Sequence, residues 1–204
     1  MEALKIISVC DDRSRAHQLE RSLQKQGYDY EIIQASWRGF GTKLNQTYEY
    51  LMQNPDIKRF IFLDGYDTYA MGKPSELNIV SDSLISTEIN CWPDAERFEH
   101  YPHTKSRFKF ANSGSYYMTA DLFKSLMQKT NVSNSDDDQR IMTDWVLSNN
   151  LQLDYEQDVF MSLCGITLNK DYEINGKRLL TPQFTMPTFV HGNGKANMEH
   201  IYIL

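Results

Sequence analysis

Two aspartates directly follow a run of apolar residues in the segment FIFLDGYDTY, residues 60–69. The apolar part predicts a buried strand, and Asp64 and Asp67 come after it, separated by Gly65 and Tyr66. Open α/β sheets bind ligands at the carboxyl ends of their strands. Carboxylate oxygens suit Mg²⁺ or Mn²⁺, which usually complete their coordination shell with substrate phosphates. The segment therefore predicts a metal held against a nucleotide, with an ordinary Asp-Gly turn as the alternative.

Two further segments carry groups that can meet a phosphate or a substrate. In WRGFGTK, Gly39 and Gly41 permit close approach of the backbone. Lys43 stands at the start of an expected helix, where a cation and the free N–H groups can bind phosphate together. Residues 112–114, Asn-Ser-Gly, offer an amide, a hydroxyl and an unobstructed backbone before an expected strand. Plain turns explain both segments equally well.

Acidic residues gather at two later positions. Residues 136–138 are three aspartates, although one of them, with Asp138 as the cap, suffices to start the helix that follows. Three carboxylates predict either a site for cationic or hydroxyl-rich material or a solvated loop. Asp154 ends another apolar stretch and is followed by Glu156 and Asp158, a second candidate acidic group.

A histidine in a glycine-rich segment supplies a candidate nitrogen ligand. His191 begins the sequence HGNGK, residues 191–195, directly after an apolar pair. Imidazole favours Mn²⁺ over Mg²⁺ when it joins carboxylates around an ion. An ordinary loop histidine is the alternative.

Strand and helix patterns alternate along the chain, and the polar groups fall at the ends of these elements. We expect strands at residues 4–9, 30–34, 59–63, 83–87 and 115–118, and a short one starting at 152–153. Helices are expected at residues 14–26, 42–53, 121–129 and 138–149, with a short helix from Pro74. Residues 94–107 are predicted to form an exposed excursion. The pattern predicts one α/β domain over residues 1–204, with a mostly parallel central sheet and helices on both faces.

Composition and charge fit a globular protein. The 204 residues carry a net charge of −6, which argues against a basic surface over the whole molecule but not against a local basic groove. No apolar run approaches the roughly 20 residues of a membrane-spanning helix. The strand pattern begins without a charged leader, so we expect a cytoplasmic protein with no membrane partner. Cys10, Cys91 and Cys164 form no CxxC pair, which predicts neither a disulfide framework nor a zinc site.

Several short motifs follow one another in a fixed order along nearly the whole chain. They are Trp37-x-Gly39, LDGYD at 63–67, EINCWPD at 88–94, NSG at 112–114, DDDQ at 136–139, LD at 153–154 and HGNG at 191–194. This succession resembles the glycosyltransferase domain of the procollagen lysyl hydroxylases and its viral and microbial relatives. The resemblance implies a GT-A, Rossmann-like fold and an Mn²⁺-dependent transfer of glucose or galactose from a UDP-sugar donor to a hydroxyl group.

The resemblance also implies roles for individual residues. Asp64, Asp67 and His191 match the metal ligands, and Tyr66 matches the aromatic residue that stacks on uracil. Asp137 and Asp138 match the acidic run associated with catalysis, where a carboxylate orients the acceptor hydroxyl, takes its proton or stabilises the sugar. The remaining matches are expected to lie at the donor: Trp37, Gly39, Lys43, Trp92, Asn112, Gly192 and Lys195.

The acceptor and the oligomeric state are left open by the sequence. The family's glycine run before the lysine is reduced here to Gly39-Phe40-Gly41-Thr42, and no iron-binding His-x-Asp pattern of a hydroxylase is found. A protein, a small hydroxylated molecule or a hydroxymethylated DNA base remain candidate acceptors. For DNA, Lys105, Arg107 and Lys109 interleave with Phe108 and Phe110, a segment that can grip nucleic acid or form an exposed loop.

Two readings compete with a transferase. Asp11 and Asp12 after the first expected strand, with Asp64 after the third, resemble a phosphoacceptor receiver domain, a signalling module. However, no lysine clearly ends a fifth strand, and the chain is about 80 residues longer than such a module. The other alternative is a non-catalytic module that only binds a nucleotide sugar.

Overall fold

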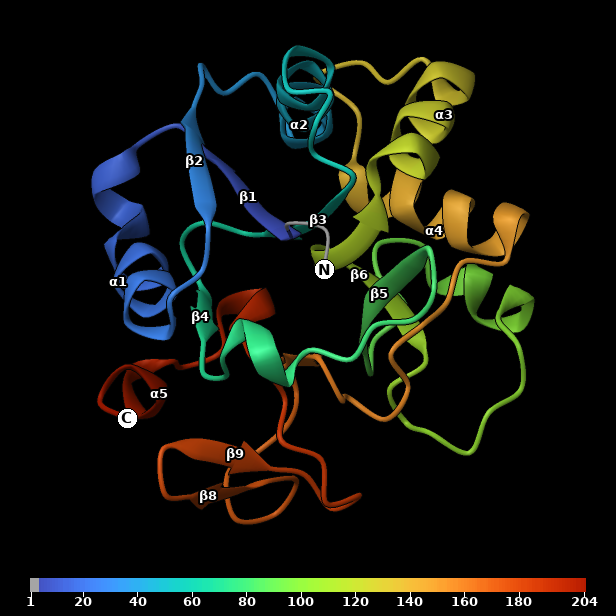
Figure 1. The fold of residues 1–204 in the computed structure, drawn as a ribbon. Helices are drawn as coiled ribbons and strands as arrows, with labels where there is room; N and C mark the ends of the chain where they lie inside the picture. The colour runs from blue at the N-terminus through green and yellow to red at the C-terminus, as the bar shows by residue number, and fades with distance from the viewer. Residues whose placement is uncertain (1–3) are drawn as a thin grey trace.

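The computed structural model describes residues 4–204, which contain a five-stranded central sheet (Figure 1). In spatial order the strands are β2 (Tyr30–Gln34), β1 (Leu4–Cys10), β3 (Arg59–Leu63), β6 (Phe110–Thr119) and β5 (Ser83–Glu88). β1 pairs in parallel with both β2 and β3, whereas β6 runs antiparallel between β3 and β5. Four strands therefore point in the same direction and bring their carboxyl ends to one edge of the sheet.

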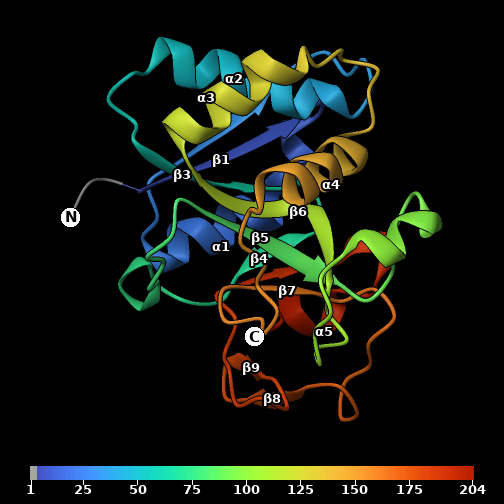
Figure 2. The same cartoon turned by 90° about the vertical axis from the view of Figure 1, so that its right-hand side faces the viewer.

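Helices cover both faces of the central sheet (Figure 2). α1 (His17–Gln26) lies on one face with the C-terminal part of the chain, and α2 (Gly41–Gln53), α3 (Ala120–Thr130) and α4 (Asp138–Asn149) lie on the other. Among residues 4–204, no helix combines the length and apolar character needed to cross a membrane. The α/β class predicted from the alternating pattern is confirmed.

β3 explains why the first polar residue after it lies at the sheet edge. Phe60 and Phe62 pack among the residues of α2, α3 and α4, whereas Ile61 and Leu63 pack on the face of α1. Successive side chains of a strand point to opposite faces, so continuous apolar residues are typical of a sheet that is covered on both sides. A carboxylate can reach solvent only beyond the end of such a strand, which is where Asp64 lies.

A second, smaller sheet was not predicted, because each of its strands has only three residues. It consists of β4 (Thr68–Ala70), β10 (Phe189–His191) and β7 (Phe160–Ser162), with β10 in the middle. The antiparallel pairing of β4 with β10 sets His191 opposite Thr68. The hairpin of β8 (Glu173–Asn175) and β9 (Arg178–Leu180) and the short α5 (Glu199–Tyr202) complete the C-terminal part.

Three expectations about local structure are wrong or only partly met. Residues 112–114 are not a turn but lie within the long strand β6, where the buried Asn112 side chain donates to Glu88 and accepts the N–H of Gly114. Residues 94–107 are not wholly exposed, since Tyr101 is buried against Phe110. The short strand expected at residues 152–153 is reduced to a single bridge between Leu153 and Ile85.

Candidate functional site

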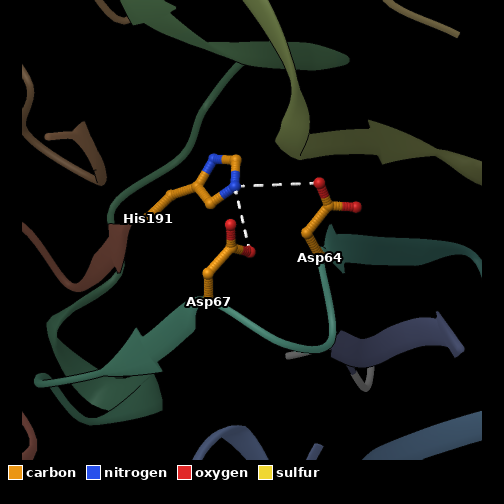
Figure 3. Close-up of side chains that lie close together, drawn as sticks. All are labelled: Asp64, Asp67 and His191. Carbon is orange, nitrogen blue, oxygen red and sulfur yellow. Dashed lines mark ion pairs between the residues drawn. The ribbon is translucent and has the colours of Figure 1, made fainter. Parts of the chain in front are cut away.

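Three side chains from three elements converge at the carboxyl edge of the central sheet (Figure 3). Asp64 follows β3, Asp67 precedes β4, and His191 ends β10. His191 Nε2 lies 3.3 Å from Asp67 Oδ1 and 3.7 Å from Asp64 Oδ2. One ligand atom from each residue lies within 4.8 Å of the others, so the three can share one ion. The sequence separated the histidine from the aspartates by more than a hundred residues, and the β4–β10 pairing brings them together.

Gly114 makes this convergence sterically feasible. A Cβ atom at residue 114 would lie 2.1 Å from His191 Cε1 and 2.8 Å from Asp64 Oδ2, which no real side chain tolerates. A glycine within a strand often marks a close approach of this kind. From the sequence, Gly114 was expected just before a strand, in either a substrate-facing segment or a plain turn; the structure places it inside β6.

Asn112 holds His191 rather than pointing at open space. Its Oδ1 lies 3.0 Å from His191 Nδ1 and accepts the N–H of Gly114, while its Nδ2 donates to Glu88 Oε1 at 2.7 Å. Because Oδ1 can only accept, Nδ1 of the histidine carries a proton and Nε2 faces the carboxylates. Burial disfavours the imidazolium, but Asp67 and Asp64 outweigh burial and raise the pKa of His191.

Glu88 is a site residue that the sequence analysis left without a role. It is buried and also accepts a hydrogen bond from Asn193 Nδ2 at 3.2 Å. Burial raises the pKa of Glu88, although the two amides oppose the shift. A single carboxylate therefore ties the β6 and β10 sides of the site together.

Lys43 bridges two carboxylates in a buried position. Its Nζ lies 2.8 Å from Asp64 Oδ1 and 2.7 Å from Asp138 Oδ2. Burial opposes its charge, but Asp138 and Asp64 together raise the pKa of Lys43. Burial also raises the pKa of Asp138, and the lysine, which is shared with Asp64, only partly offsets that shift. Lys43, which was expected near a donor phosphate, is thus held between these two carboxylates at the edge of the cavities.

The acidic run divides into separate roles. Asp137, not Asp138, is the N-cap of α4, since its side chain accepts the N–H of Arg140 at 3.0 Å. Asp138 is thereby left to face Lys43 in the interior. Asp154 belongs to no second acidic site: its buried carboxylate accepts three backbone N–H groups, those of residues 158–160.

Three glycines of the motifs are required by close packing. A Cβ atom at Gly39 would lie 2.5 Å from the carbonyl oxygen of Asn134, and one at Gly41 would lie 2.0 Å from that of Ser133. The loop before α2 is thus packed on the loop before α4, which carries the acidic run. Gly192 is similarly close to a side chain, because its Cβ would lie 2.5 Å from Met198 Cγ.

Two adjoining cavities surround the converging side chains. The first, of about 480 Å³, is lined by the metal-ligand candidates Asp64, Asp67 and His191, by Lys43, Asp137 and Asp138, and by Glu88, Asn112 and Trp92 among others. The second, of about 320 Å³, shares Phe40, Lys43, Asp64 and Asp67 with it and adds Trp37, Tyr66, Asp11 and Arg15. Both volumes fall in the range of small-molecule sites.

Most of the residues that were predicted to bind the sugar donor form part of the wall of one of these cavities. Trp92 is 67% exposed at the wall of the first, and Trp37 packs edge-on against Phe40 in the second. Gly39, Gly192 and Lys195 are not among the lining residues, and Lys195 is exposed. The structure therefore brings the predicted aromatic and acidic residues together and leaves these three outside.

Comparisons with known proteins agree with this geometry. The PLOD GT domain model matches residues 2–203. An uncharacterized protein of Acanthamoeba polyphaga mimivirus is 29% identical over 167 residues, which cover 78% of this chain and 36% of that protein. The multifunctional procollagen lysine hydroxylase and glycosyltransferase LH3 of Homo sapiens is 29% identical over 157 residues, 70% of this chain and 21% of that protein. The chain thus spans about a fifth to a third of the length of these relatives.

A known crystal structure has a similar fold. A crystal structure of a glycosyltransferase involved in the glycosylation of the major capsid of PBCV-1 superposes with a TM-score of 0.60 at 13% identity, and covers 99% of this chain and 100% of that one. The fold is therefore that of a GT-A glycosyltransferase, and the receiver-domain alternative is wrong. With a family match over nearly its full length, the chain belongs to the PLOD GT domain family.

Proposed function

We propose that this chain is an Mn²⁺-dependent glycosyltransferase that moves a hexose from a UDP-sugar to a hydroxyl group, and that residues 1–204 form one catalytic domain. The observation that carries the proposal is the convergence of Asp64, Asp67 and His191 beside a cavity that also contains Asp138. The family membership supports a sugar transferase, and the two carboxylates and the imidazole support a bound metal ion.

The residues present fit a divalent ion of the Mn²⁺ type. Two carboxylates and one imidazole are ligands that such an ion accepts. Gly114 leaves the space between His191 and Asp64 free of a side chain, and Asn112 fixes the histidine with Nε2 toward the carboxylates. When bound, such an ion supplies Lewis acidity that offsets the negative charge developing on a diphosphate leaving group.

The surrounding side chains have roles that follow from their positions. Tyr66 and Trp37 offer aromatic faces to a base in the second cavity, and Trp92 offers one to the sugar at the first. Lys43 keeps Asp138 within the cavity, where this carboxylate can orient an acceptor hydroxyl or take its proton. A raised pKa suits a general base, because proton transfer is most effective when the pKa approaches the working pH.

We propose a protein or a small hydroxylated molecule as the acceptor. Four of the five residues considered for DNA are engaged elsewhere: Phe108 and Phe110 are buried, Arg107 pairs with Asp171, and Lys109 lies 3.4 Å over the ring of Phe98. The fifth, Lys105, is exposed. Buried rings cannot stack on bases, which removes the aromatic part of the nucleic-acid hypothesis. The cytoplasmic location stays a prediction from the sequence.

Release of UDP from a panel of UDP-sugars, with and without Mn²⁺, tests the proposal without knowledge of the acceptor. We expect metal-dependent release with at least one donor, its loss in Asp67→Ala, and a strong reduction in His191→Ala. Asp29→Ala is a matched control, because Asp29 is an exposed carboxylate paired with Lys5 outside the cavities. Wild-type release in both site variants would refute the metal assignment. UDP binding without any release would instead favour the non-catalytic binding module.

A further inference from the structure

The second cavity contains two charged residues that the donor assignment does not use. Asp11 follows β1, and Arg15 lies in the short 3-10 helix Arg13–Ala16 that comes next. Both line the cavity beside Tyr66 and Trp37, and both are exposed at its rim. The aromatic rings there can stack on any base, so stacking alone does not select one.

Tyr66 is held in a fixed orientation by its neighbours. Its hydroxyl donates to the Asp11 carboxylate and accepts the backbone N–H of Asp12 at 3.0 Å. The same tyrosine stands between Asp64 and Asp67 in the sequence, so it belongs to the loop that carries these two candidate metal ligands. The carboxylate that holds the ring therefore lies beside any base that stacks on this ring.

Arg15 lies over the same ring. Its guanidinium carbon is 4.0 Å from the centre of the Tyr66 ring, where a planar base would otherwise stack. A cation–π contact at an exposed site is weak, so an arriving base can displace the guanidinium. The long arginine side chain then remains within reach of the edge of that base.

We propose that Asp11 and Arg15 read the polar edge of the base and select uracil over cytosine, an inference that rests on the proposed use of a UDP-sugar. Uracil presents an N–H donor at position 3 and a carbonyl acceptor at position 4. Cytosine presents the inverse, an acceptor at position 3 and an amino donor at position 4. An ionised carboxylate only accepts hydrogen bonds and a guanidinium only donates them. With Asp11 at position 3 and Arg15 at position 4, the pair complements uracil and opposes cytosine.

Comparison of UDP with CDP isolates base reading from other effects. The two nucleotides carry the same diphosphate and the same charge. Removing one charged side chain from the cavity therefore shifts the affinities for both through electrostatics in the same direction and by the same factor. Only a contact with the base edge changes the ratio of the two dissociation constants.

Calorimetric titration of UDP and CDP in the presence of Mn²⁺ measures this ratio in the wild type and in four variants. We expect the wild type to prefer UDP by about tenfold or more, as one or two discriminating hydrogen bonds to charged groups give. In Asp11→Asn and Arg15→Gln the amide can present either a donor or an acceptor, so the preference should fall below about threefold, partly through tighter CDP binding. Arg15→Ala should lose the preference without gaining CDP affinity.

Arg13→Ala is the matched control, because Arg13 is an exposed arginine two residues away whose guanidinium pairs with Glu20. It should keep the wild-type ratio. A wild-type ratio near one, or an unchanged ratio in Asp11→Asn and Arg15→Gln, would overturn the base-reading inference while UDP binding itself stands. Absence of UDP binding in the wild type would overturn the proposed donor as well.

Discussion

Replacement of Gly114 by alanine tests the geometry of the proposed metal site at a single atom. The added Cβ would lie 2.1 Å from His191 Cε1, against the 3.4 Å or more of an ordinary contact. Either the imidazole or the β6 backbone must therefore retreat by about 1.3 Å, the difference between these distances. Metal–ligand distances tolerate deviations of only about 0.2 Å, so a shift of this size should remove His191 from the proposed coordination shell.

The expected result is a large loss of metal affinity with a moderate loss of stability. Perturbing residues that merely orient a ligand costs about 10–100-fold in affinity, so displacement of the ligand itself should cost at least about 100-fold. Overpacking typically destabilises a fold by about 1–3 kcal/mol. Calorimetric titration with Mn²⁺ measures the metal affinity, and thermal unfolding without metal measures the stability. The two measurements together separate the two effects.

Gly176→Ala supplies the control for this experiment. Gly176 has a φ of 63°, and a Cβ atom added there would have no other atom within 4 Å, so alanine is strained but meets nothing. It should lose roughly 1–2 kcal/mol of stability through the left-handed backbone alone and keep full Mn²⁺ affinity. Unchanged Mn²⁺ binding in Gly114→Ala would refute the argument that His191 and Asp64 converge on a shared ion.

Three further substitutions separate orientation, chemistry and folding. Asn112→Leu removes the acceptor that orients His191 and should weaken Mn²⁺ binding about 10–100-fold; calorimetric affinity equal to the wild type would contradict this. Asp138→Asn should lower donor hydrolysis or transfer by about 10²–10⁴-fold while the dissociation constant of UDP stays within about threefold, and unchanged turnover would exclude Asp138 from the chemistry. Asp154→Asn turns an amide N–H toward backbone donors and should lower the free energy of unfolding by about 1–3 kcal/mol, measured by thermal unfolding. Glu156→Gln, at an exposed neighbouring residue, is the control and should leave the unfolding temperature unchanged.

The sequence predicted the central layer well because its signals are local. The apolar run before Asp64 and the helix patterns of α1 to α4 depend on burial and on the periodicity of neighbouring residues. The positions of Asp64 and Asp67 at a strand end follow from the same pattern. The predicted helix boundaries agree with the structure within three residues: α4 matches at both ends, and the largest difference is at the start of α1, where residues 13–16 form a 3-10 turn before His17.

Partners across the chain were beyond the reach of local patterns. The sequence did not reveal that Lys43 pairs with Asp64 and Asp138, which lie far along the chain; its contact with phosphate stays a prediction. Glu88 received no role, because nothing in its local sequence reveals the amides of Asn112 and Asn193. These contacts arise where the ends of several strands meet, and their identity depends on strand order.

The sequence by itself determined the α/β class, the acidic pair after β3 and the order of motifs that assigns the chain to its family. Only the tertiary structure decided which residues surround that pair. The pairing of β4 with β10 places His191 beside Asp67, and Gly114 leaves the room that this approach needs. The physical reason is that residue type and spacing encode burial along one element, whereas a metal site requires atoms from several elements within a few ångströms, a condition that chain packing alone fulfils.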